Sequence, residues 1–116
     1  MNEYNEYKVT VINRKTASTP ELDRAIYVGR PGPLGNPFSA SEHGRLEAIA
    51  LYKQWLQLQY LTGNKAVIDA LIGLAKILYK DKEITLSCWC APEPCHADII
   101  GLAIRNMINR QLIDRD

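Results

Sequence analysis

Three cysteines and a histidine lie close together near the end of the chain, in the pattern Cys88-x-Cys90-x4-Cys95-His96. The pattern falls where an apolar, strand-like run ends and a helix-like run begins. The start of a helix offers unpaired backbone N–H groups and the positive end of the helix dipole, which favour the thiolate form of Cys95. In open α/β sheets, ligands collect outside the carboxyl ends of the strands. This junction is therefore the first candidate for chemistry.

The first interpretation of the cluster is a pocket for an anion or a small ligand. Backbone N–H groups near Cys95 and His96 would hold a phosphate or carboxylate. Cys95 or Cys88 would be the nucleophile, with His96 or Glu93 as acid or base. Two features oppose simple phosphatase chemistry: the turn contains no arginine, and Asp98 would compete with an anion there.

Two other interpretations stay open at this point. Thiolates and an imidazole are suitable zinc ligands, although adjacent Cys and His at a helix start rarely point at one ion. The cysteines would otherwise be buried filler, because cysteine is among the most buried residue types. The zinc alternative uses Cys88, Cys90, Cys95 and His96.

A second motif is the run Tyr27 to Phe38, YVGRPGPLGNPF, which is rich in glycine and proline. Its glycines let the backbone approach a ligand, Arg30 can hold a phosphate or carboxylate, and Asn36 can hydrogen-bond a base or sugar. The alternative is a rigid turn with Arg30 in solvent or paired with Glu42 or Glu47. The residues expected to contact a ligand are Asn13, Arg14, Gly29, Arg30, Gly32, Gly35, Asn36 and Cys90.

The elements that position these motifs follow from hydrophobic periodicity and breakers. Trp89 is expected to pack under a helix or to stack on a base, and Tyr52, Trp55 and Tyr60 to fill core or surface. We predict a small Rossmann-like α/β fold, its sheet mainly parallel with helices packed on it. The predicted strands are 7–13, 24–29 and 83–90; the helices are about 44–62, 67–78 and 95–112; the loops are 16–23 and 30–39. Gly63 is expected to end the first helix, and Asn64 to cap the second.

Composition narrows the classes of partner. The 116 residues carry a net charge of +1, which argues against strong binding to duplex nucleic acid. No apolar run is long enough to span a membrane. The clustered, odd-numbered cysteines indicate reduced thiols and a cytoplasmic location. We expect a single domain over residues 1–116, with 1–6 as a flexible tail.

With both motifs established, the chain resembles family 4326 of the domains of unknown function, short proteins of bacteria and their viruses. The stretches that carry the resemblance are VINRK (11–15), YVGRPGPLGNPFS (27–39) and LSCWCAPEPCHADII (86–100). The resemblance implies a cytosolic α/β domain and supplies no activity. A more distant likeness is to an α/β family that opens a helix with Cys-His-Arg, where this chain has Ala97 in place of the arginine.

These features together predict a pocket for a nucleotide-like or other phosphorylated small molecule. Whether the ligand is hydrolysed, transferred or only sequestered stays open, because no unambiguous catalytic base stands in the sequence. A structural zinc domain is the third alternative, and no other cofactor is expected.

Overall fold

The computed structural model describes residues 7–38, 40–89 and 95–113. The tail predicted at 1–6 lies outside these ranges. The elements, in chain order, are β1 (Lys8–Asn13), α1 (Thr19–Arg24), β2 (Ile26–Tyr27), α2 (Ala40–His43), α3 (Arg45–Leu61), α4 (Lys65–Asp81), β3 (Glu83–Cys88) and α5 (His96–Asn109).

The three strands form one parallel sheet in the order β1-β3-β2, so the predicted α/β fold with a parallel sheet is confirmed. The central strand, β3, is the most buried of the three, as expected for a strand covered on both sides. The register pairs Asn13 with Cys88 and Tyr27 with Ser87. The carboxyl ends of all three strands therefore meet at one edge of the sheet.

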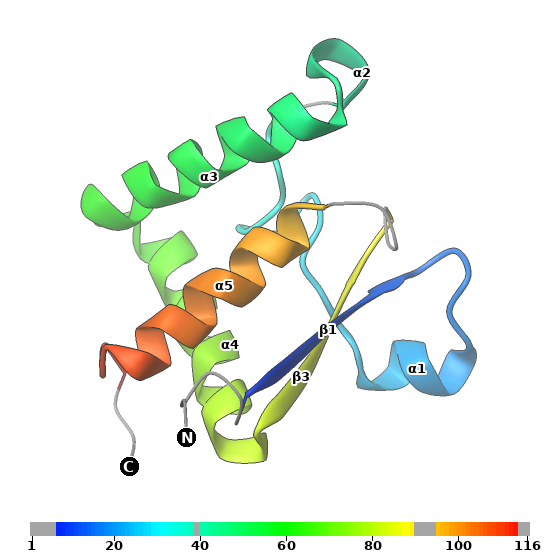
Figure 1. Cartoon of the computed structure of the whole chain (residues 1–116), viewed down its shortest axis with the longest axis vertical. Helices are drawn as coiled ribbons and strands as arrows, with labels where there is room; N and C mark the ends of the chain where they lie inside the picture. Colours follow the sequence, from blue (N-terminus) through cyan, green and yellow to red (C-terminus); the bar gives the residue numbers. More distant parts are fainter. Residues whose placement is uncertain (1–6, 39, 90–94, 114–116) are drawn as a thin grey trace.

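Helices α4 and α5 pack against the sheet and against each other, and α1 lies on the other side of β1 and β3 (Figure 1). Contact between α5 and the sheet is close at Gly101, where an added Cβ would lie 3.0 Å from Cγ1 of Val9. The core that these helices form includes Tyr52, Leu71, Leu78, Leu86, Ile100, Ile104 and Ile108, all fully buried.

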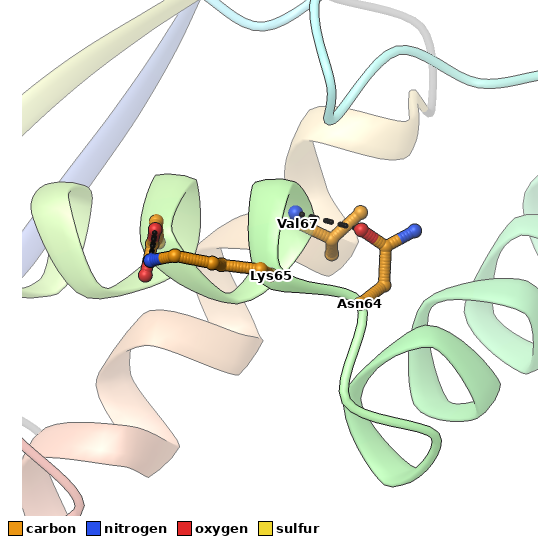
Figure 2. A network of polar contacts seen from close by, with 4 residues as sticks. Asn64, Lys65 and Val67 are labelled. Atoms are coloured by element: carbon orange, nitrogen blue, oxygen red, sulfur yellow. Dashed lines mark hydrogen bonds and ion pairs between the residues drawn. The ribbon is translucent and has the colours of Figure 1, made fainter.

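The turn between α3 and α4 follows the predicted capping pattern. Gly63 takes a φ of +79°, which glycine adopts without strain, and ends α3. Figure 2 shows the Asn64 side chain accepting a hydrogen bond from the Val67 N–H, at 3.4 Å. In the first turn of α4, Lys65 forms an ion pair with Asp69 at 2.7 Å. The predicted cap at Asn64 is thus confirmed.

The prediction of a loop over 16–23 is wrong, because α1 begins at Thr19. Ser18 and Glu21 form a capping box, and Pro20 occupies the first turn, where its missing N–H costs nothing. The short helix α2 was not predicted either. In the part of the chain that is described, no helix is long and apolar enough to cross a membrane.

Candidate functional site

A cavity of about 360 Å³ opens at the carboxyl ends of β2 and β3. Six residues predicted from the sequence line it: Gly29, Arg30, Asn36, Cys88, Cys95 and His96. The other lining residues are Tyr27, Phe38, Arg45, Ala48, Ile49 and Trp89. The cysteine–histidine junction and the glycine–proline loop therefore face one cavity, which α3 completes. Predicted residues Cys90 and Glu93 lie outside the described ranges.

The cysteine–histidine junction contains a thiol–imidazole pair. Sγ of Cys95 lies 3.4 Å from Nδ1 of His96, and Nε2 of His96 lies 2.8 Å from the carbonyl oxygen of Val28. A carbonyl only accepts hydrogen bonds, so Nε2 carries a proton. In the neutral imidazole, Nδ1 then has the lone pair and accepts a hydrogen bond from the Cys95 thiol.

The Val28 carbonyl that orients His96 is itself fixed by the sheet. The Val28 N–H donates to the Ser87 carbonyl of β3 at 3.2 Å, which continues the β2–β3 pairing. On another side, the Tyr52 ring meets the imidazole edge-on, with 5.1 Å between centroids. His96 is thus held by a hydrogen bond at one nitrogen and by an aromatic contact.

Cys95 is the N-cap residue of α5, and its backbone is held by the first turn of the helix. Its N–H donates to a carboxylate oxygen of Asp98 at 3.0 Å, in a capping box. Cys95 and Cys88 are 2% and 1% exposed, and both belong to the core cluster while also lining the cavity. The two cysteines therefore fit both interpretations drawn from the sequence, that of buried core residues and that of residues in contact with a ligand.

The glycine–proline loop is shaped by two successive turns. Gly32 N–H donates to the Gly29 carbonyl, and Gly35 N–H donates to the Gly32 carbonyl, each at 3.0 Å. A Cβ on Gly35 would lie 2.7 Å from the Arg30 nitrogen, a backbone clash. Gly32 and Gly35, which were predicted to contact a ligand, do not line the cavity. They allow the turns that place Arg30.

Two side chains tie this loop to α3. Asn36 donates from Nδ2 to the Ala48 carbonyl at 3.3 Å and accepts from the Phe38 N–H at 2.8 Å. The Tyr52 hydroxyl donates to the Leu34 carbonyl at 2.6 Å. Burial, with a smaller contribution from Cys95, raises the pKa of the Tyr52 hydroxyl above its usual value of 10.0, so the donor stays protonated.

An aromatic pair, Tyr27 and Trp89, forms another part of the lining. The rings meet edge-on at 6.5 Å, Trp89 Nε1 donates to the Tyr27 hydroxyl at 3.1 Å, and that hydroxyl donates to the Arg30 carbonyl at 2.7 Å. Trp89 is 58% exposed, so the prediction that it packs under a helix is wrong. Its ring packs against Tyr27 and Arg14 instead.

Arg14 and Asn13, which were predicted to contact a ligand, lie near this pair and do not line the cavity. The Arg14 guanidinium lies 5.0 Å from the Tyr27 ring centroid and 5.8 Å from that of Trp89, and it donates to Ser87 Oγ at 3.3 Å. Asn13 donates to the Trp89 carbonyl at 3.3 Å. Although β1 ends beside β3 as expected, these side chains support the aromatic pair.

The charge of the lining is positive. Arg30 comes from the glycine–proline loop and Arg45 from the first residue of α3, and no Asp or Glu is among the described residues that line the cavity. Glu42, a predicted partner of Arg30, lies 3.9 Å from His43 instead. Sequence reasoning missed Arg45. The helix dipole disfavours a cation at the start of a helix. An arginine at the predicted start of this helix was therefore a signal in the sequence that Arg45 is part of a site.

Three of the four residues of the zinc alternative, Cys88, Cys95 and His96, are described by the structure. Both ring nitrogens of His96 already face partners, Cys95 Sγ and the Val28 carbonyl. Within the described ranges, no group of three or more His, Cys, Asp or Glu side chains could hold a metal ion. Cys90, one of the four proposed ligands, lies outside those ranges.

Together, the fold and the cavity define a small parallel α/β domain with a cationic, thiol-containing pocket at the carboxyl ends of its strands. The chain belongs to the family described as domain of unknown function DUF4326, which matches residues 11–106. This confirms the resemblance drawn from the sequence. No curated protein and no solved structure gives a match.

Proposed function

We propose that the cavity binds a nucleotide-like or other phosphorylated small molecule. The observation that carries the proposal is that two arginines from different elements, Arg30 and Arg45, line the same cavity. Guanidinium groups bind phosphate through paired, charge-assisted hydrogen bonds. The volume of about 360 Å³ falls within the range of about 300–1,000 Å³ common for small-molecule sites.

The exposed Trp89 ring in the lining provides a surface on which a planar base of the proposed ligand can stack. A planar base stacked on an aromatic side chain gains about 1–3 kcal/mol. A lining that contains both arginines and aromatic rings suits a molecule with a phosphate and a planar ring. The reduced state of Cys88 and Cys95 fits a cytoplasmic location, which is part of this proposal.

Binding is tested by calorimetry with a panel of nucleoside monophosphates and cyclic nucleotides. Losing one charged hydrogen-bonding partner costs about 1.5–3 kcal/mol, so Arg30→Ala and Arg45→Ala should each weaken binding by roughly 10- to 100-fold. Arg24→Ala is the matched control, because Arg24 is exposed on α1 and away from the lining. Equal affinities in Arg30→Ala, Arg45→Ala and Arg24→Ala would refute the proposal that Arg30 and Arg45 bind the phosphate.

Mass spectrometry of small molecules released from the denatured protein tests the same proposal without a chosen ligand. A co-purified phosphate ester supports the pocket as proposed. Ligand recovered unchanged after incubation favours a sequestering protein over an enzyme. Metal analysis that finds about one zinc per chain would instead favour the structural zinc domain.

A further inference from the structure

We propose that Cys95 is the nucleophile of a phosphomonoester-cleaving site in this cavity, with His96 as its acid and base. The inference rests on the proposed function, because it takes the bound phosphate as the reacting group. It adds a reaction and a substrate class, the monophosphate esters.

The first argument is the direction of the hydrogen bonds. The Nε2–H group of His96 donates a hydrogen bond to the Val28 carbonyl at 2.8 Å, which leaves Nδ1 as the base toward Cys95 Sγ at 3.4 Å. A nucleophile, a base and a third group that orients the base are the parts of an activated thiol. Here the third group is a backbone carbonyl fixed by the sheet.

The second argument is the charge around the sulfur. Phosphoryl transfer depends chiefly on positioning and on cations that stabilise the transferring group. The turn before α5 contains no arginine, but Arg30 and Arg45 line the same cavity from two other elements. Cys95 also sits at the start of α5, where backbone N–H groups favour an anion. Among the described residues, the Asp98 carboxylate accepts from the Cys95 N–H and does not line the cavity.

The reaction balances without any other reagent than water. The Cys95 thiol gives its proton to Nδ1 of His96, and the sulfur forms a bond to phosphorus. The bond between phosphorus and the ester oxygen breaks, and that oxygen takes the proton from Nδ1. Water, deprotonated by Nδ1, then attacks phosphorus; the S–P bond breaks, the proton returns to sulfur, and inorganic phosphate leaves.

The test is phosphate release from nucleoside monophosphates, measured beside binding. Wild type should release phosphate, and His96→Gln should lose roughly 100-fold or more of the rate. Cys95→Ser should lose release while keeping measurable affinity; Arg24→Ala should match wild type. Binding without release in wild type would overturn this inference and leave the binding proposal intact, whereas absence of binding would overturn both.

A second measurement uses the wild-type chain alone, so it does not depend on whether a variant folds. Iodoacetate, an anionic alkylating reagent, should modify Cys95 before the other cysteines, as located by peptide mass. Iodoacetamide, its neutral counterpart, should show a weaker preference, and inorganic phosphate should slow the iodoacetate reaction. First modification at another cysteine, or no protection by phosphate, would contradict the inference.

Discussion

Substitution of Tyr52 by phenylalanine should destabilise the whole domain through one hydrogen bond. The Tyr52 ring is fully buried, and its hydroxyl donates to the buried Leu34 carbonyl at 2.6 Å. Removing the donor leaves that carbonyl unsatisfied, at a cost of about 1–3 kcal/mol. A domain of 116 residues unfolds with an entropy of about 0.24 kcal/mol/K. The melting temperature should therefore fall by about 4–12 °C.

Calorimetry or thermal circular dichroism measures this change, with Tyr60→Phe as the control. Tyr60 is 38% exposed, and no hydrogen bond of its hydroxyl occurs within the described structure. Its variant should melt within about 1 °C of wild type. If Tyr52→Phe also melts within 1 °C of wild type, the loop is not anchored through this bond and the reasoning is wrong.

The buried Tyr52 hydroxyl should also make the stability of the protein depend on pH. Because burial raises the pKa of Tyr52 in the folded state, its stabilisation is complete below pH 10 and is lost as the pH rises above that value. Above about pH 10 the unfolded chain releases the proton and the folded chain keeps it. The stability gap between wild type and Tyr52→Phe should then narrow by about 1.4 kcal/mol per pH unit. A gap that widens above pH 10 in urea titrations would contradict this.

Three glycine substitutions extend these tests, each measured by urea unfolding. Gly73→Ala should stabilise by about 0.5–1 kcal/mol, because an added Cβ meets nothing within 4 Å in the middle of α4. Gly101→Ala should stabilise the protein less than Gly73→Ala does, because its Cβ would lie 3.0 Å from Val9 Cγ1. An equal gain in stability would show that Val9 can move aside without cost. Gly35→Ala should destabilise by about 1–3 kcal/mol and weaken ligand binding, since its Cβ would lie 2.8 Å from Cα of Arg30; unchanged affinity would separate the loop from the site.

Local signals in the sequence predicted most of the fold. The β-branched run before Asn13, the apolar run before Cys88 and the cap at Asn64 each act within a few residues, so their patterns are visible without neighbours. The error at α1 came from giving Pro20 the weight of a breaker. Ser18 and Glu21 have the sequence spacing of a capping box, and a proline is favourable in the first turn of such a helix.

The site was harder to predict than the fold, because side-chain direction depends on packing. Arg14 and Asn13 stand at the correct sheet edge, yet they turn to the Tyr27–Trp89 pair and leave the cavity to Arg30 and Arg45. The spacing around Arg45 does not show how α3 will pack on α4 and α5, and therefore where the Arg45 side chain will lie. The tautomer of His96 likewise depends on a carbonyl 68 positions away along the chain.

The position of β3 has a consequence for how the protein is made. This strand is the last of the three along the chain, yet both other strands pair only with it in the sheet. During synthesis β1 and β2 therefore emerge with their edges unpaired, and α3 and α4 follow before any ladder can close. The sheet and the cavity at its edge therefore form together, once β3 and the start of α5 have left the ribosome.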